Sequence, residues 1–286
     1  MCQLNSIQST INYIKKELVG IYSLRESESI AYILIENVLD FSRTQIQLNK
    51  NESLTENQFE KIWNYLADLQ KSKPIQYVLG EADFYELKFK VNEHTLIPRP
   101  ETEELVHAII NENHEKNLNV LDIGTGSGCI PICLAKHLVK ANVISVDIST
   151  EAIKTARENA IRNEVEVQYY ERDILNWEKF EWRKLDIIVS NPPYVTEAEQ
   201  EKMEKNVLDY EPHTALFVSD RDPLIFYRKI AELALSHLNQ GGKLYFEINE
   251  SLGDEMKQLL EQKGFSDIKL RRDINGKDRM MSAIKR

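Results

Sequence analysis

The stretch Leu185-Asp186-Ile187-Ile188-Val189-Ser190-Asn191-Pro192-Pro193-Tyr194 decides the fold. Its apolar first half, bounded by polar residues and prolines, is typical of a fully buried parallel strand. The two prolines fix their φ angles and lack N–H donors, so the chain leaves this strand as a stiff segment. Open α/β sheets bind ligands at the carboxyl ends of their strands. An amide side chain, free carbonyl groups and an aromatic ring there suit a planar group that carries an NH2, although a simple proline-rich strand exit is the alternative.

The composition is that of an ordinary globular protein. The 286 residues allow one large domain, or a main domain with a smaller companion. The net charge of -10 argues against a protein that binds nucleic-acid phosphates over a broad surface, although it leaves room for a local basic patch. No apolar stretch approaches the roughly 20 residues of a membrane span, and no signal peptide is apparent, so we expect a cytoplasmic protein.

The cysteines and histidines predict no metal site. An odd, sparse set of three cysteines fits a reducing compartment and forms no disulfide framework. Cys129 and Cys133 share one face of a predicted helix, but no further ligand lies near them in sequence. We interpret them as small buried apolar residues.

The first third of the chain predicts a separate helical domain over residues 1–72. Apolar residues recur at helical spacing in three segments, the second capped by Ser27 or Ser29 and the third by a capping box of Thr55 with Gln58. Residues 73–98 then predict a linker that contains a short β-hairpin. The rigid corner at residues 96–103, with two prolines around an arginine, is either part of this linker or one wall of a ligand pocket.

Residues 99–286 alternate between strand and helix patterns. Strands are predicted at 120–123, 143–147, 165–170, 185–189 and 243–248, followed by a hairpin of 265–270 with 279–284. Helices are predicted at 129–138, 151–160, 224–238 and 255–262, with Thr150 as a cap. The pattern predicts a doubly wound α/β sheet with an antiparallel hairpin at one end.

A glycine loop opens the first predicted helix of this sheet. Gly124-Thr125-Gly126-Ser127-Gly128 follows a strand directly, the context in which such loops bind nucleotides. Its spacing is G-x-G-x-G, so no glycine stands at the third glycine position of the dinucleotide pattern G-x-G-x-x-G, and no lysine follows as in a P-loop. The loop therefore favours a nucleoside ligand without a phosphate chain. Asp147 ends the next strand, where an acid binds ribose hydroxyls. Asp122 is expected to place a second carboxylate beneath the loop.

This combination resembles the cofactor site of class I methyltransferases, which bind S-adenosylmethionine on a seven-stranded Rossmann-like sheet. The resemblance implies that the loop passes the amino-acid part of the cofactor, that Asp147 binds the ribose, and that Asp173 flanks the adenine. The implied cofactor-binding residues are Asp122, Gly124, Thr125, Gly126, Ser127, Gly128, Asp147, Ile148, Asp173, Ile174 and Asn191. The loop alone would fit any α/β nucleotide fold.

Asn-Pro-Pro-Tyr at the end of a strand resembles the motif of methyltransferases that act on planar nitrogens. The Asn191 side-chain oxygen and the Pro192 carbonyl can accept both N–H bonds of an NH2 group, while Tyr194 packs on its planar face. We therefore expect Asn191, Pro192 and Tyr194 to be catalytic and Pro193 to complete the substrate site. Adenine-N6 and protein-glutamine methyltransferases share this motif, so it does not choose between them.

A wider set of motifs resembles the release factor glutamine methyltransferase family, also called HemK or PrmC. The set comprises Gln76-Tyr77-Val78-Leu79-Gly80, Leu96 to Glu103, Asp122 to Gly128, Tyr210-Glu211-Pro212 and Asp273 to Arg279. The resemblance implies methylation of the glutamine N5 in the Gly-Gly-Gln loop of bacterial class I peptide-chain release factors, with the helical domain docking the factor.

Two other functions stay open, and the chain departs from the family at one position. A DNA or RNA adenine methyltransferase would need a basic face or a target-recognition domain. A silent cofactor-binding module would not need the amide of Asn191. Asn249 stands where the family usually has glycine. Because asparagine is the non-glycine residue that best tolerates a left-handed φ, we expect a local adjustment and not a loss of activity.

Overall fold

The computed structural model describes residues 6–113, 117–138 and 140–286, which divide into two compact units. Unit 1 comprises Met1–Gly80 with Glu204–Tyr210, and unit 2 comprises Glu81–Met203 with Glu211–Arg286. Unit 1 extends to Gly80 rather than to residue 72, because apolar side chains of the short helix α5 (Ile75–Leu79) pack on its core. The expected linker over 73–98 is therefore shared between the two units.

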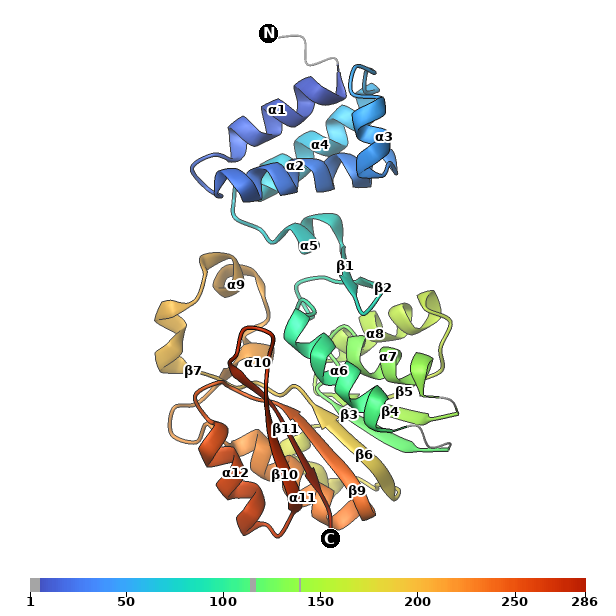
Figure 1. Ribbon diagram of the computed structural model, residues 1–286, viewed down its shortest axis with the longest axis vertical. Helices are drawn as coiled ribbons and strands as arrows, with labels where there is room; N and C mark the ends of the chain where they lie inside the picture. The colour runs from blue at the N-terminus through green and yellow to red at the C-terminus, as the bar shows by residue number, and fades with distance from the viewer. Residues whose placement is uncertain (1–5, 114–116, 139) are drawn as a thin grey trace. The chain divides into compact units, whose positions relative to one another are not determined.

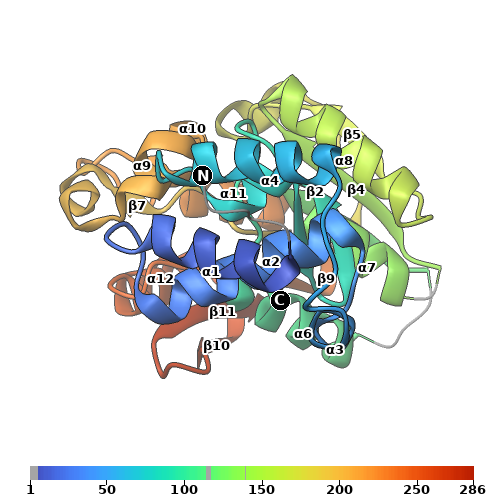
Figure 2. The ribbon, with the colours of Figure 1, turned by 90° about the horizontal axis from the view of Figure 1, so that it is seen from above.

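Unit 1 is built on four helices around a core of isoleucine and leucine side chains. They are α1 (Ile7–Leu18), α2 (Leu24–Leu39), α3 (Arg43–Leu48) and α4 (Glu56–Leu69), and α1 lies beside α2 in both ribbon views (Figures 1 and 2). The capping box of Thr55 with Gln58 is confirmed at the start of α4. The expected caps of α2 are wrong, because Ser23 accepts the capping hydrogen bond and Ser27 is buried within the helix.

Unit 2 contains a seven-stranded sheet in the order β10-β11-β9-β6-β3-β4-β5 (Figure 1). The five strands β9, β6, β3, β4 and β5 run parallel to one another, whereas β11 is antiparallel to both of its neighbours, β9 and β10. The strand bounds are β3 (Asn119–Ile123), β4 (Asn142–Asp147), β5 (Gln168–Glu171), β6 (Leu185–Ser190), β9 (Leu238–Glu247), β10 (Ser266–Arg272) and β11 (Asp278–Ile284). The expected sheet with its C-terminal hairpin is confirmed.

Helices cover both faces of the sheet, so unit 2 has three layers. Strand side chains alternate between two cores: Val120 of β3 faces α6 (Pro100–Glu112), α7 (Cys129–His137) and α8 (Thr150–Arg162), and Leu121 faces α11 (Ile225–His237) and α12 (Gly253–Gln262). The cap of α8 is Ser149 instead of Thr150, which is its first residue. None of the helices in the described ranges is long and apolar enough to cross a membrane.

Short elements complete the chain. The expected hairpin is confirmed as β1 (Glu81–Phe84) with β2 (Leu87–Lys90). The remaining elements are η1 (Ile174–Lys179), β7 (Val195–Thr196), η2 (Glu197–Lys202), α9 (Lys205–Tyr210), α10 (His213–Leu216) and β8 (Phe217–Val218).

The strand order creates a crevice between β3 and β6. The chain builds β3, β4 and β5 outward in one direction, and then returns to place β6 on the other side of β3. Connections leave the two strands toward opposite sides at such a switch point, and ligands bind there. The Ser190 hydroxyl donates to the carbonyl of Ile123 over 2.7 Å, which holds the ends of β6 and β3 together.

Candidate functional site

A cavity of about 400 Å³ lies at the carboxyl ends of β3, β4, β5 and β6, within unit 2. Its volume lies in the range of about 300–1,000 Å³ that small-molecule pockets have. The lining comes from segments distant in sequence: residues 94 and 96–99, Thr102, residues 123–127, 129 and 130, residues 146–149 with 152, residues 172–175, residues 190–193, residues 212, 214, 215 and 217, and Phe226 with Ile230. Of the predicted site residues, the cavity is lined by Gly124, Thr125, Gly126, Ser127, Asp147, Ile148, Asp173, Ile174, Asn191, Pro192 and Pro193.

Asp147 ties the end of β4 to the glycine loop. Its Oδ2 accepts the backbone N–H of Gly126 over 2.9 Å, and its Oδ1 accepts that of Ser149, also over 2.9 Å. Burial raises the pKa of the Asp147 carboxyl, and the backbone hydrogen bonds act in the opposite direction. Each oxygen keeps a second lone pair. The carboxylate can therefore still accept hydroxyl groups from a ligand in the cavity.

Two glycines of the loop are favoured for different reasons. Gly124 has a φ of 85°, which side chains rarely adopt, although a Cβ there would lie at an ordinary contact distance of 3.6 Å from the Asn191 carbonyl oxygen. Gly128 has a φ of 84°, and a Cβ there would lie 3.0 Å from the Cβ of Ala156 on α8. Gly128 does not line the cavity, so its expected place in the ligand site becomes a packing role at the start of α7.

Asp122 does not reach the cavity either. It is fully buried on the α7–α8 face of the sheet, in register with Ser145 and Tyr169 on the next two strands. The Ser145 hydroxyl donates to Asp122 Oδ2 over 2.5 Å and also contacts the Thr125 hydroxyl. Asp122 therefore acts on the loop through Ser145. Burial raises the pKa of Asp122 to about 7, against the hydrogen bond from Ser145.

The far end of the cavity is partly apolar. Asp173 accepts the Leu175 N–H over 2.9 Å, and so starts the helical turn η1 that presents Ile174. Ile148 is 63% exposed although it lines the cavity. An apolar side chain left open in a pocket gains free energy when a flat apolar group covers it.

Asn191 is held by a line of side chains behind the cavity wall. Its Nδ2 donates to the Thr102 hydroxyl over 3.3 Å, and this hydroxyl donates to Glu247 Oε2 over 2.6 Å. Tyr194 donates its hydroxyl to the other oxygen, Glu247 Oε1, over 3.0 Å. Tyr194 is not among the residues that line the cavity, and the expected packing of its ring on a planar substrate stays a prediction.

The predicted rigid corner forms a wall of the cavity, together with the segment around Pro212. Leu96, Ile97 and Arg99 line the cavity. The almost fully buried Glu211 carboxylate accepts the Ile97 N–H over 3.1 Å and pairs with the Arg99 guanidinium over 2.5 Å. This pair joins two motifs that lie over a hundred positions apart, and neither motif alone indicated it.

Sequence reasoning missed the role of Glu247. Glu247 ends β9 next to β6, and a charged residue at the end of this buried run was the available signal. Asn249 does not have a positive φ, so the chain needs no left-handed conformation at this position. Its amide instead donates to the Tyr194 carbonyl over 3.2 Å and to Glu199 Oε2 over 2.9 Å. It fastens the chain directly after the Asn-Pro-Pro-Tyr segment.

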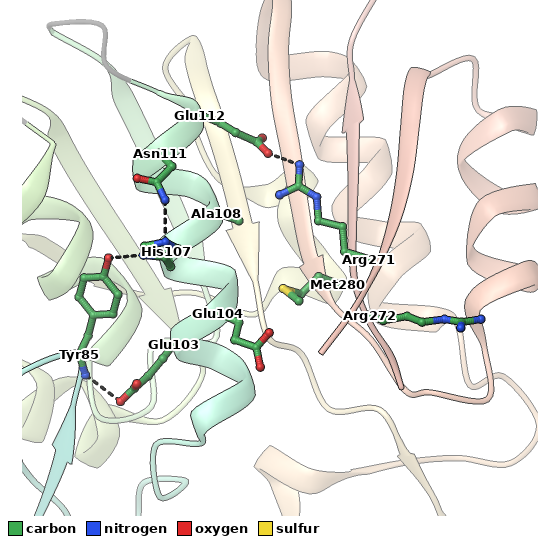
Figure 3. A pocket seen from close by; sticks show the side chains of 10 residues that line it. All are labelled: Tyr85, Glu103, Glu104, His107, Ala108, Asn111, Glu112, Arg271, Arg272 and Met280. Atoms are coloured by element: carbon green, nitrogen blue, oxygen red, sulfur yellow. Dashed lines mark hydrogen bonds and ion pairs between the residues drawn. The ribbon is translucent and has the colours of Figure 1, made fainter. Parts of the chain in front are cut away.

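A second cavity, of about 540 Å³, lies between α6 and the β10–β11 hairpin (Figure 3). Its polar groups bind one another: His107 contacts the Tyr85 hydroxyl and Asn111, and Arg271 pairs with Glu112. None of the predicted site residues lines it. Within residues 6–113, 117–138 and 140–286, no three His, Cys, Asp or Glu side chains are grouped so that they could hold a metal ion.

Comparisons with known proteins agree with this geometry. Residues 10–80 match the PrmC N-terminal domain and residues 101–210 match the Methyltransferase small domain. In fold, this chain resembles a methyltransferase from Pyrococcus furiosus, with a TM-score of 0.52 and 18% identity over 81% of this chain and 99% of that one. An rRNA methyltransferase of T. thermophilus solved with AdoMet and guanosine has a TM-score of 0.51, with 18% identity over 72% of this chain and 50% of that one. The class I methyltransferase fold is confirmed.

Sequence relatives give the family. The chain is 50% identical to the release factor glutamine methyltransferase of Flavobacterium psychrophilum, over 92% of this chain and 94% of the relative. It is 44% identical to that of Bacteroides thetaiotaomicron, over 95% and 97%. With this identity over nearly the whole length, the chain belongs to the release factor glutamine methyltransferase family.

Proposed function

We propose that this chain transfers a methyl group from S-adenosylmethionine to the side-chain N5 of the glutamine in the Gly-Gly-Gln loop of bacterial class I peptide-chain release factors. The observation that carries the proposal is the place of Asn191. Its amide lies at the wall of a nucleoside-sized cavity, in a chain that is 50% identical to a release factor glutamine methyltransferase.

The residues of the cavity fit this cofactor. Asp147 keeps lone pairs for ribose hydroxyls, and the exposed Ile148 with Ile174 offers apolar contact for adenine. Residues 124–127 carry no large apolar side chain and leave room for the amino-acid part. When bound, the cofactor supplies an electrophilic methyl group on a sulfonium.

Asn191 and Pro192 orient the accepting nitrogen. The lone pair of an amide nitrogen is delocalised, so this nitrogen is a weak nucleophile, and orientation is the main help that a protein can give. The Asn191 side-chain oxygen and the Pro192 carbonyl accept its two N–H bonds, which directs the substrate nitrogen at the methyl group. The nitrogen loses its proton after methylation, so no separate base is assigned. We assign the ring of Tyr194 to packing on the planar face of the substrate amide, while its hydroxyl donates to Glu247.

The protein partner follows from the relatives, whose names give release factors as substrates. Unit 1, which matches the PrmC N-terminal domain over residues 10–80, is the part we assign to docking of the factor. The net charge of -10 supports a protein substrate over direct binding of nucleic acid. A cytoplasmic location fits such a partner.

The test is incubation of the enzyme with a release factor and labelled S-adenosylmethionine, followed by peptide mapping. Methylation is expected on the Gly-Gly-Gln peptide and should vanish when its glutamine is replaced by alanine. Labelling that survives this replacement, or labelling of adenine in DNA or RNA instead, would contradict the proposal. Asn191→Ala should strongly reduce turnover while the cofactor affinity changes by no more than about tenfold, since one neutral hydrogen bond contributes about 0.5–1.5 kcal/mol. A silent cofactor-binding module would show no turnover in the wild type.

A further inference from the structure

Behind the cavity, Glu247 connects two segments that carry the substrate site. It is 1% exposed and is the last residue of β9, which lies directly beside β6 in the sheet. One carboxylate oxygen accepts the hydroxyl of Thr102 on α6, and the other accepts the hydroxyl of Tyr194 after β6. The sequence motifs did not indicate that any of these three residues orients Asn191.

The hydrogen-bond partners of Glu247 give it the role of an acceptor. Burial raises the pKa of the Glu247 carboxyl, and Glu101 on α6 adds to this, while the hydrogen bonds from Thr102 and Tyr194 and the charge of Arg279 on β11 act in the opposite direction. Tyr227 on α11 donates its hydroxyl to the backbone carbonyl of Glu247, not to the carboxylate. Both carboxylate oxygens therefore have a hydroxyl donor, as a buried carboxylate requires.

The chemistry of the partners gives this line of hydrogen bonds one direction. Each oxygen of the Glu247 side chain accepts one hydroxyl, from Tyr194 and from Thr102, so Thr102 donates its single hydroxyl hydrogen to Glu247. The Thr102 oxygen is left with lone pairs alone on the side of Asn191, 3.3 Å from Nδ2. Only the NH2 end of the Asn191 amide can bind there. The carbonyl end of that amide must then be the end available to a ligand.

We infer that Glu247 and Thr102 are positioning residues that fix the Asn191 amide with its oxygen, and not its nitrogen, toward the substrate. This inference rests on the proposed function, because a substrate NH2 group requires acceptors. A flipped Asn191 would present a second NH2 group to the substrate and lose the hydrogen bond. The shape of the site would hardly change, so the effect concerns the polarity of the amide.

Thr102→Val and Thr102→Ser form a matched pair for the test. Valine keeps the shape of threonine and removes the hydroxyl, whereas serine keeps the hydroxyl. With a release factor as substrate, kcat of the valine variant should fall about 10- to 100-fold, as expected for lost orientation. The serine variant should stay within about threefold of wild type, since its hydrogen bonds are retained. Cofactor affinity, measured by calorimetry, should stay near the wild-type value in both.

Glu247→Gln tests the direction of the hydrogen bonds with little change of shape. A glutamine amide can donate to Thr102, which can then donate to the Asn191 oxygen and allow the flipped amide. We expect the same fall in kcat, with unchanged cofactor affinity and a folded protein by circular dichroism. Adding Thr102→Val to Asn191→Ala should not reduce residual single-turnover methylation further, since Thr102 acts through Asn191.

Each result decides between a positioning role and a structural one. Full turnover in Thr102→Val or Glu247→Gln, equal losses in the valine and serine variants, or independent losses in the double variant would overturn the inference. A wild-type enzyme that methylates no release factor would overturn the proposed function, and this inference with it. Wild-type turnover with unaffected variants would overturn the inference alone.

Discussion

Replacing Asp122 by asparagine is expected to remove a pH dependence of the free energy of unfolding that comes from this carboxyl. Its pKa rises from 3.8 to about 7 in the folded protein because the carboxyl is fully buried, although the hydrogen bond from Ser145 acts in the opposite direction. Between these values the folded protein holds a proton that the unfolded chain has released, so stability falls as the pH rises toward 7 and is constant above it. A shift of about three pKa units corresponds to about 4 kcal/mol in total.

Most of this difference lies in an accessible pH range. Between pH 5 and 8 the wild type should lose about 2.5 kcal/mol relative to Asp122→Asn. Asparagine keeps the shape and can still accept the Ser145 hydroxyl, so the two proteins should differ least at pH 5. The variant should be the more stable protein at pH 8.

The measurement is urea unfolding at several pH values, followed by tryptophan fluorescence in a Trp63→Phe background. Trp177 and Trp182 belong to unit 2, so this signal reports on the unit that contains Asp122. Asp83→Asn is the matched control, since the Asp83 side chain is 80% exposed. Parallel stability curves for the wild type and Asp122→Asn from pH 5 to 8 would refute the reasoning.

Three further predictions concern the loop, the strand end beside it and the thiols. Asp147→Ala should weaken cofactor binding about 10- to 100-fold in calorimetry, as expected for lost hydrogen bonds to a charged group; unchanged affinity would remove Asp147 from the site. Gly128→Ala should lower the free energy of unfolding by about 2–4 kcal/mol, because a positive φ and a 3.0 Å contact both oppose a Cβ, whereas Gly264→Ala, with a similar φ and open space, should lose only the smaller part. Cys129 and Cys133 should resist alkylation at pH 8 in the native protein and react after denaturation, because burial raises the pKa of both thiols, that of Cys129 to about 12; rapid native labelling, read by mass spectrometry, would contradict this.

The strands of the sheet could be predicted from the sequence because parallel strands are short apolar runs with polar ends. Strand β6, which ends at Ser190, is buried at five of its six positions, which is why its pattern was clear. Helix caps were less predictable. Ser23, Ser27 and Ser29 are the same residue type near the same helix start, and only the three-dimensional path of the chain shows that Ser23 is the cap.

The site could be predicted where one local segment supplies it. Asn191, Pro192 and the glycine loop lie on strand ends, so their position follows from the strand pattern. Asp122 failed because the alternation along β3 turns it to the other face of the sheet, one position before Ile123. The partners of Glu247 and Glu211 could not be predicted because they are distant in sequence, and only the folded chain brings them together.

The position of β11 in the sheet has a consequence for synthesis of the protein. This strand is later in the chain than β9 and β10, yet it lies between them. Until residues 278–284 leave the ribosome, β9 has an open edge and β10 has no partner in the sheet. An unpaired strand edge invites association with other chains. Translation that stalls before Asp278 would therefore leave a domain with a formed cofactor crevice and an unpaired sheet edge that can bind other chains. A chain that ends at Lys277 should aggregate in light scattering, whereas the chain that includes β11 should stay monodisperse.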